Sequence, residues 1–389
     1  MTPTVGYPRF SDEEHERRAD LVRALLDDEE LDALVVFGWS ALGRALQADV
    51  HYLSGFLGMR DNYVLFPRHG EPVLFVQSFN HVPNAAAVSH LVDVRWGGVD
   101  SGATLGGELA ARGAQRVGVV GMMPYQHHDR MRELSGAQVR DATAPFRRLR
   151  VVKSDEELAW LRRGAAHTDA AMAALREQMR PGMREYELAD VIERAYTRDG
   201  GLTTFHYLAS TPMAAPDRCV PAQVLSDRVL RAGDVVTTEI SASHGGYAGQ
   251  SLRTFVLEAE PTPLFTELHD VALEVFHAVV AAMRPGATEQ DVLDAAAPIA
   301  AHGFAIVDAL VHGFGIGILP PSIRTHETTH EPAPWTFEVG QTLVVQPNVV
   351  TADESAGVQV GELVEITADG ARSMHGFPVE LVRVGAGVA

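Results

Sequence analysis

Cysteine is nearly absent from this sequence, which contains one, Cys219, among 389 residues. A single cysteine cannot form a disulfide within the chain, which is compatible with a reducing cytosol. The sequence also lacks an apolar run of the about 20 residues that a membrane-spanning helix requires. The N-terminal residues contain no apolar signal core. We therefore expect a cytoplasmic protein.

Basic residues are scarce relative to acidic ones, with 32 Lys and Arg against 51 Asp and Glu and a formal net charge of −19. Nucleic acids and anionic membranes bind clusters of Lys and Arg, so the charge argues against both as partners. The hydrophobic share of 46% and the charged share of 21% are ordinary for a globular protein. We expect a folded protein that binds neither nucleic acid nor membrane.

The chain is too long for one ordinary hydrophobic core, so we expect two domains. In the N-terminal part, Ser11 and Glu14 form a capping-box pattern at the start of a helix. The apolar run ALVVFG at 33–38 predicts a buried strand, and the segments on either side of the turn RHGE predict a hairpin. This alternation predicts a small α/β domain over residues 1–146.

The second predicted domain covers residues 147–389 and begins in the basic run RRLRVVKS. Ser154 begins a long helix that ends at the breaker Arg180-Pro181-Gly182. The same Met-Arg-Pro-Gly stop recurs at 283–286, again between two predicted helices. We favour a duplication with pseudo-twofold symmetry, although Arg-Pro-Gly is also a common helix stop.

Short apolar strands punctuated by turns lie between these helices, for example VVTTEIS at 235–241 and TLVVQPNVV at 342–350. They predict a curved antiparallel sheet covered by four long helices, and so an α+β fold. The segments KSDEEL, MRPGMREYEL, RAGDVVTTEIS, GYAGQSLRTF, VHGFGIG, VVQPNVV and GVQVGELVEIT resemble the pita-bread superfamily. This superfamily includes methionine aminopeptidase, aminopeptidase P, prolidase and creatinase. DVHYLSGF at 49–56 resembles its creatinase/prolidase N-terminal domain.

The resemblance identifies the positions of the superfamily's metal ligands, and most of them have changed. Where the metallopeptidase members carry Asp, Asp, His, Glu and Glu, this sequence has Glu239, Gln250, His312, Gln346 and Gly361. A further family histidine corresponds to Leu319, and another falls in Pro221-Ala222-Gln223, where no histidine exists.

This residue set has too little negative charge for a pair of divalent cations. Glu239 is its single carboxylate, and the amide oxygens of Gln250 and Gln346 are poor replacements for anionic ligands. We therefore predict a site with no metal and no other cofactor. The run THETTHEPAP at 325–334 has loop composition, so we predict a lid or surface loop there and not a zinc-binding helix.

Glu239 and His312 are the predicted catalytic residues. Burial would raise the pKa of Glu239 towards the working pH, as a general acid or base requires. The alternative is a structural carboxylate paired with Arg253 or Arg324. His312 would transfer protons or hydrogen-bond a substrate carbonyl, and the alternative is a structural histidine.

The predicted substrate contacts are Gln250, Gln346, Arg60, Arg324 and Cys219. The two glutamines would hold polar groups of the substrate, or alternatively bond to each other. Arg60 resembles a creatinase arginine that reaches the partner subunit's site and binds the substrate carboxylate, and Arg324 would be a second carboxylate clamp. Surface salt bridges are the alternative for the arginines. Cys219 would be a thiolate near the site, or an inert thiol.

The resemblance to creatinase, a metal-free member, suggests a metal-independent enzyme that hydrolyses a C–N bond in a small carboxylate-bearing nitrogenous compound. Creatine itself is not expected, because the glutamates that bind it correspond here to Leu252 and Gly361. The alternatives are a metal-free decarboxylase or isomerase, a non-catalytic binding protein, and an atypical mono-metal Xaa-Pro peptidase. The resemblance also implies a homodimer.

Overall fold

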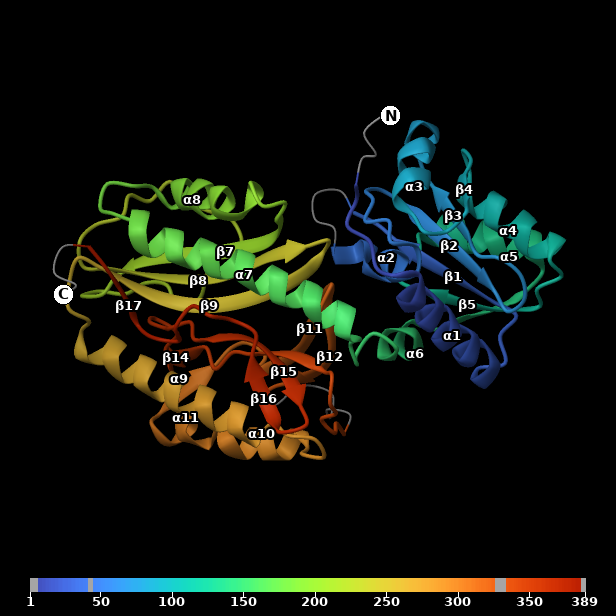
Figure 1. The fold of residues 1–389 in the computed structure, drawn as a ribbon. Helices are drawn as coiled ribbons and strands as arrows, with labels where there is room; N and C mark the ends of the chain where they lie inside the picture. The colour runs from blue at the N-terminus through green and yellow to red at the C-terminus, as the bar shows by residue number, and fades with distance from the viewer. Residues whose placement is uncertain (1–5, 41–44, 326–333, 386–389) are drawn as a thin grey trace. The chain divides into compact units, whose positions relative to one another are not determined.

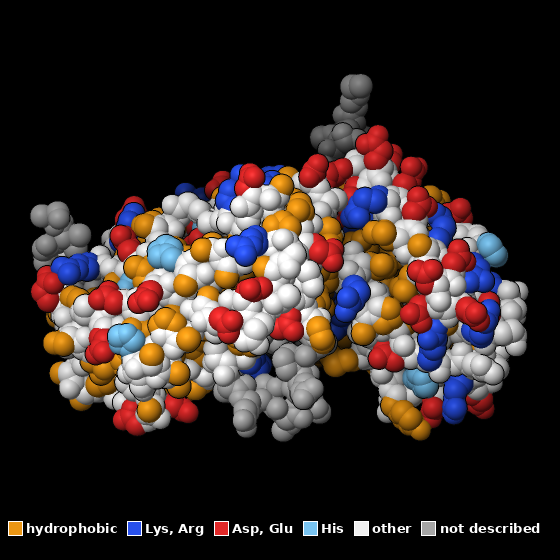
Figure 2. All heavy atoms as spheres, turned by 90° about the horizontal axis from the view of Figure 1, so that it is seen from below, with side chains coloured by type: hydrophobic (Ala, Val, Ile, Leu, Met, Phe, Trp, Pro, Cys, Tyr) orange, Lys and Arg blue, Asp and Glu red, His pale blue; other side chains and the backbone are white. Residues whose placement is uncertain are grey.

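The computed structural model describes residues 6–40, 45–325 and 334–385. These residues divide into two compact units, and the chain passes from the first to the second between Arg150 and Val151 (Figure 1). Each unit has its own hydrophobic clusters and its own sheet. On the face that Figure 2 shows, acidic and basic side chains are interspersed over both units. None of the described helices is long and apolar enough to cross a membrane.

The N-terminal unit contains a six-stranded sheet of mixed direction in the order β4-β3-β2-β1-β5-β6. The strands are β1 (Ala33–Gly38), β2 (Asn62–Pro67), β3 (Val73–Val76), β4 (Asp93–Trp96), β5 (Arg116–Val120) and β6 (Gln138–Asp141). The helices are α1 (Asp12–Asp28), α2 (Ala48–Ser54), α3 (Val82–Val88), α4 (Ser101–Ala111), α5 (Tyr125–Ser135) and α6 (Thr143–Arg148), with 3-10 turns at Ala45–Gln47 and Phe79–His81. The predicted α/β fold is confirmed.

Alternation along β1 explains why helices cover both faces of this sheet. Leu34 and Val36 lie in a cluster with residues of α1, α2 and α6, whereas Val35 and Phe37 lie in a cluster with residues of α4 and α5. The predicted hairpin is present, since β2 pairs antiparallel with β3. Ser11 is the N-cap of α1, as predicted, and accepts from the Glu14 amide. The Glu14 side chain binds Arg17 and Arg18.

The C-terminal unit is built on a nine-stranded sheet with the path β12-β11-β13-β15-β9-β8-β7, and it is antiparallel except where β17 joins β9. Its strands are β7 (Leu202–Pro212), β8 (Asp234–His244), β9 (Tyr247–Leu257), β11 (Val311–Gly315), β12 (Gly317–Ile323), β13 (Thr342–Val345), β15 (Gly361–Thr367), β16 (Gly370–Ser373) and β17 (Val382–Val384). β10 (Phe304–Ile306) pairs separately with β14 (Val349–Thr351). The predicted curled antiparallel sheet is confirmed.

Helices cover the sheet of this unit from two sides (Figure 1). They are α7 (Asp155–Gln178) and α8 (Glu185–Thr197) on one side, and α9 (Pro263–Ala282), α10 (Glu289–Ala295) and α11 (Ala297–Ala301) on the other. The prediction of four long helices is wrong for the last one, because the chain breaks into the short α10 and α11 with Pro298 at the start of α11. After the first and the third long helix, Gly182 and Gly286 both turn the chain with left-handed φ values of 92° and 85°.

A glycine contact fixes α7 against β9. A Cβ added to Gly164 of α7 would lie 2.4 Å from the Tyr247 carbonyl oxygen, and one added to Gly249 of β9 would lie 2.2 Å from the Ala165 Cα. Only glycine permits so close an approach of helix and strand backbones. The contact lies next to Gln250 and therefore helps to place that side chain.

Candidate active site

Strand register brings the altered ligand positions together in the C-terminal unit. Glu239 lies on β8 and Gln250 on β9, where Ser241 pairs with Gln250 and Glu239 pairs with Leu252. The two side chains are therefore diagonal neighbours on one face of the sheet. His312 lies on β11, which pairs with β13, and Gln346 follows directly after β13.

Hydrogen bonds join three of these side chains to one another and to Asp308. Gln250 Nε2 donates to Glu239 Oε1 at 2.9 Å and to Gln346 Oε1 at 3.3 Å. Gln346 Nε2 in turn donates to Asp308 Oδ2 at 2.9 Å. We call Glu239, Gln250, Gln346 and Asp308 the glutamine relay. It has a carboxylate at each end and two neutral amides between them.

Asp308 was not predicted from the sequence. It lies in the loop before β11, four positions before His312, where no motif marks it. Its Oδ1 accepts from the Ala309 amide at 2.7 Å, which holds the carboxylate in place. The nearest signal in the sequence is its position close to a retained family histidine.

Burial is the main influence on the titration of the site. It raises the pKa of Glu239 to about 7, and the negative charge of Asp308 adds to this rise. Burial lowers the pKa of His312, so the ring is neutral at neutral pH. His312 Nδ1 lies 3.2 Å from the Gly313 carbonyl oxygen and must be its donor, because a carbonyl only accepts. The ring also interacts with the Gln346 side chain.

Among the described residues, neither of the two arginines considered as structural partners of Glu239 forms an ion pair with it. Arg253 is fully buried and pairs with Glu362 at 2.6 Å. Arg324 is exposed just after β12, and its charge contributes to the lowered pKa of His312. The structure therefore places a positive charge at the edge of the site, within electrostatic range of His312.

Cys219 is placed unfavourably for chemistry, and Arg60 belongs to the other unit. Cys219 is half-buried, and burial together with the charges of Glu354 and Asp353 raises the pKa of its thiol. A raised pKa disfavours the thiolate that a nucleophile requires. Arg60 is exposed in the N-terminal unit, where its carbonyl accepts from the Gln47 side chain. The predicted lid at 325–334 lies largely outside the described residues.

Metal-binding side chains are sparse around the relay in the described part of the chain. Among residues 6–40, 45–325 and 334–385, no group of three or more His, Cys, Asp or Glu side chains could hold a metal ion. At Gly361, the position of the family's last ligand, an added Cβ would lie 2.3 Å from the Val345 carbonyl oxygen and 2.8 Å from the Gln346 Cα. The backbone here has closed over the space in which a ligand side chain would begin.

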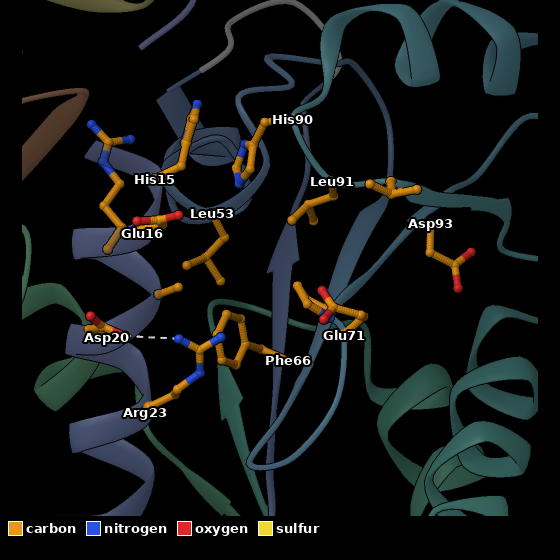
Figure 3. A pocket seen from close by; sticks show the side chains of 14 residues that line it. His15, Glu16, Asp20, Arg23, Leu53, Phe66, Glu71, His90, Leu91 and Asp93 are labelled. Atoms are coloured by element: carbon orange, nitrogen blue, oxygen red, sulfur yellow. Dashed lines mark hydrogen bonds and ion pairs between the residues drawn. The ribbon is translucent and has the colours of Figure 1, made fainter. Parts of the chain in front are cut away.

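The N-terminal unit contains a separate hollow of about 600 Å³ (Figure 3). His15 and His90 stack there with ring centroids 3.5 Å apart, and Arg23 pairs with Asp20 at 2.9 Å. Burial lowers the pKa of His15 to about 4 and that of His90 to about 3. These histidines are neutral across the physiological pH range. Their lowered pKa values make the stability of the folded unit depend on pH.

Comparisons with known proteins agree with the fold. Residues 159–368 match metallopeptidase family M24, and residues 18–152 match the creatinase/prolidase N-terminal domain. The chain is 29% identical to a probable dipeptidase PepE of Mycobacterium tuberculosis, over 98% of this chain and 99% of that protein. It is 23% identical to an Xaa-Pro dipeptidase of Pyrococcus furiosus, over 94% and 99%.

Solved structures show the same architecture. The dipeptidase PepE from Mycobacterium ulcerans superposes with a TM-score of 0.80 at 24% identity, covering 97% of this chain and all of that one. The prolidase from Pyrococcus horikoshii gives 0.78 at 20% identity, covering 94% of this chain and 100% of that one.

These comparisons correct the predicted chemistry. A metal-independent, creatinase-type hydrolase of small non-peptide compounds is contradicted, because the matching family is one of metallopeptidases and the full-length relatives are named dipeptidases. The prediction was wrong because it relied only on the charge of the residues at the ligand positions. The similarity to the dipeptidases extends over nearly the whole chain. With more than half of its length matching, the chain belongs to metallopeptidase family M24.

Proposed function

We propose that this protein is a peptide hydrolase that cleaves dipeptides at the glutamine relay. The observation that carries the proposal is the similarity to a probable dipeptidase over 98% of the chain. Similarity of fold alone would be weaker support for a dipeptidase. Here the sequences of both the N-terminal unit and the C-terminal unit match in one alignment. Peptide substrates also suit a site rich in neutral amides, which hydrogen-bond peptide N–H and C=O groups.

We further propose that the site is a ligand-deficient version of the M24 centre. Gln250, Gln346 and Gly361 supply no negative charge, and the backbone at Gly361 leaves no room for a side chain. The chemistry that this chain's own residues support is proton transfer at Glu239. With a pKa of about 7, its carboxylate can take a proton from an attacking water and its acid form can return one to the leaving amine.

His312 and Arg324 support this reaction in different ways. The neutral His312 ring holds Gln346 in position. The exposed guanidinium of Arg324 suits the C-terminal carboxylate of a dipeptide, which it would bind through paired hydrogen bonds. Arg60 stays a candidate for the same carboxylate in a homodimer, as the sequence predicts.

The proposal is tested by incubating the purified protein with a panel of dipeptides, including Xaa-Pro sequences, with and without added divalent cations. Release of free amino acids is followed by chromatography. We expect cleavage by the wild-type protein and a loss of at least about 100-fold in Glu239→Gln, since general acid–base groups contribute about 10²–10⁴-fold. A folded wild-type protein that cleaves no member of the panel under any of these conditions would contradict the proposal.

A second candidate, dipeptide binding without hydrolysis, is favoured by one observation. The amides at the former ligand positions are bonded to each other and to Glu239, as in a binding site. Calorimetry with intact dipeptides distinguishes the two functions. Saturable binding with full recovery of the dipeptide would support the binding protein.

A further inference from the structure

A pair of histidines lies on the side of the C-terminal sheet that faces away from the glutamine relay. His244 is the last residue of β8, and His167 lies on α7, the helix that covers this side of the sheet (Figure 1). Side chains alternate between the faces of a strand, so His244 and Glu239 point to opposite faces. Thr238, on the same face as His244, contacts Met172 of α7. The pair is therefore separate from the candidate active site.

The ring nitrogens of this pair lack partners. Both nitrogens of His244 and Nε2 of His167 are buried with no hydrogen-bond partner in the described part of the chain. His244 is 6% exposed, and the two ring centroids lie 6.3 Å apart with the ring planes at 41°. Buried polar atoms are nearly always hydrogen-bonded, and unsatisfied ones call for an explanation such as a bound water or ion. A partner shared by both rings would satisfy them together.

The separation of the rings fits one metal ion between them. Histidine nitrogens bind zinc at about 2.0–2.1 Å, and other first-row divalent ions have a similar size. With the half-width of an imidazole ring added on each side, an ion that binds one nitrogen of each ring at a wide angle holds the centroids about 6 Å apart. The observed centroid distance of 6.3 Å agrees with this spacing.

Both rings have the protonation state that metal binding requires. Burial lowers the pKa of His244 to about 4 and also lowers that of His167, so each neutral ring has one lone pair near pH 7. Two charged side chains act on His167 with opposite signs. The Asp199 carboxylate favours a cation there, and the Arg163 guanidinium opposes one. The two imidazoles themselves must therefore supply the affinity.

Imidazole nitrogen selects a particular class of cation. Mg²⁺ and Ca²⁺ prefer oxygen ligands, whereas Zn²⁺, Ni²⁺ and Cu²⁺ bind imidazole, and Cu²⁺ binds most tightly of the first-row divalent ions. Within the described ranges, no third His, Cys, Asp or Glu joins the pair. Water must therefore complete the shell, and His167 is only half-buried, so solvent is close on its side.

We propose that His167 and His244 form a binding site for one Cu²⁺ ion, with water in the remaining positions. The inference goes beyond the proposed peptide hydrolysis and does not depend on it. The ion would link α7 to the end of β8, close to the contact between Gly164 and the Tyr247 carbonyl oxygen. Because these elements are distant in sequence and the ion binds only the folded chain, it would stabilise the C-terminal unit.

The first test is Cu²⁺ binding by the full-length protein after treatment with a chelator. Competition with a chelator of known affinity measures the dissociation constant, and electron paramagnetic resonance counts the coordinated nitrogens. We expect one tight Cu²⁺ per chain, coupled to two imidazole nitrogens, that a large excess of Mg²⁺ does not displace. If no tight Cu²⁺ binds, or if its spectrum shows no nitrogen coupling, the inference is wrong and the rings share a water.

His167→Gln and His244→Gln each remove one ring. Each variant should bind Cu²⁺ at least about 10-fold more weakly, since loss of even an outer-shell partner costs about 10–100-fold in metal affinity. Each should also lose one nitrogen coupling, and the double variant should lose the site. His244 is buried and His167 is half-buried, so His167→Gln decides the outcome should His244→Gln fail to fold.

The chain contains 17 histidines, so the control replaces two others. His69 and His81 are exposed in the N-terminal unit, and His69→Gln with His81→Gln should keep the wild-type affinity and spectrum. Unchanged affinity and spectrum in a folded His167→Gln or in the folded double variant would reveal an adventitious ion only and would overturn the inference.

A further variant separates this site from the relay. Glu239 points to the opposite face of β8, so Glu239→Gln should bind Cu²⁺ as tightly as the wild-type protein does. Loss of the ion from this variant would locate it at the relay and refute the histidine site. Thermal unfolding gives a second readout, because Cu²⁺ should raise the Tm of the wild-type protein and of Glu239→Gln, but not that of the variant without His167 and His244.

Discussion

At the residue scale, the ionisation of Glu239 controls what the site can do. Its pKa is raised to about 7 by burial and by the charge of Asp308. The base form is therefore present above pH 7 and is lost as the pH falls through that value. We expect kcat/KM for a dipeptide to rise with pH and to reach half its limiting value near pH 7. A rate that stays constant from pH 5 to pH 8 would speak against Glu239 as the base.

Asp308→Asn extends this prediction. Removing the negative charge removes one of the two causes of the raised pKa, so the midpoint of the pH profile should move to lower pH. The surface variant Asp294→Asn should leave the midpoint where it is. Steady-state rates between pH 5 and pH 9 measure both midpoints.

The ligand positions allow a second prediction at this scale. Replacing Gln250 by Asp and Gln346 by Glu restores two anionic donors beside Glu239 and His312. We expect this double variant to gain a thermal stabilisation by Mn²⁺ that the wild-type protein lacks, because a ligand that binds only the folded state stabilises it. Differential scanning fluorimetry measures the shift in Tm.

The control for the double variant carries the same added charge on the surface, at the exposed Gln138 and Gln178. Gln138→Asp with Gln178→Glu should show no response to Mn²⁺. An equal response in the wild-type protein would mean that its own residues already hold the ion, and the proposed ligand deficiency would then be wrong.

At the element scale, the contact between α7 and β9 positions the site. Gly249→Ala would place a Cβ 2.2 Å from the Ala165 Cα, so helix and strand must separate. We expect a loss of about 1–3 kcal/mol in the free energy of unfolding, as for other overpacked cores. Activity should fall as well, because Gln250 follows Gly249 directly. Urea denaturation and dipeptide turnover measure the two effects.

Gly107→Ala in α4 is the comparison, because a Cβ at Gly107 meets no atom within 4 Å. Alanine is the better helix former, so this variant should be stabilised slightly, by up to about 1 kcal/mol. A similar destabilisation in both variants would show that the close approach of α7 and β9 is not the cause.

Elements with strong local signals could be predicted from the sequence. Ser154 does begin a helix with a complete capping box to Glu157, and the segments around RHGE do form a hairpin. Such features depend on a few neighbouring residues. The break between α10 and α11 could not be predicted as easily, because a proline near a helix start is also compatible with one continuous helix.

Four residues of the candidate cluster could be located from motif positions, whereas the hydrogen bonds between them could not be predicted. Motif positions identified Glu239, Gln250, His312 and Gln346, and the structure brings all four into one cluster. Asp308 could not be predicted from the sequence, because it lies in a loop and contacts Gln346 only in the folded chain. The direction of each amide likewise depends on contacts between strands that are distant in sequence.

At the scale of the whole molecule, the two units have separate cores, yet both contain buried histidines with lowered pKa values. Burial lowers the pKa of histidines in both, for example His15 and His90 in the N-terminal unit and His244, His269 and His312 in the C-terminal unit. These rings fold in the neutral form. Acid should therefore act on both units, each through its own histidines.

The sign of the effect follows from linkage. Because the folded protein holds these pKa values below the ordinary value of about 6.5, the unfolded chain binds protons first as the pH falls. Stability is full above pH 6.5 and is lost between about 6.5 and 4. Each such histidine adds a slope of up to about 1.4 kcal/mol per pH unit in this window. Calorimetric unfolding at a series of pH values measures the slope.

The stacked pair His15 and His90 in the hollow of the N-terminal unit allows the pH dependence of unfolding to be tested in that unit alone (Figure 3). His15→Gln with His90→Gln removes two buried titrating groups, so the unfolding of the N-terminal unit should depend less on pH between 6.5 and 4. The exposed His69 and His81 provide the control, since their replacement by Gln should leave the slope unchanged. If the slope of the double variant equals that of the wild-type protein, the acid response must come from groups other than this pair.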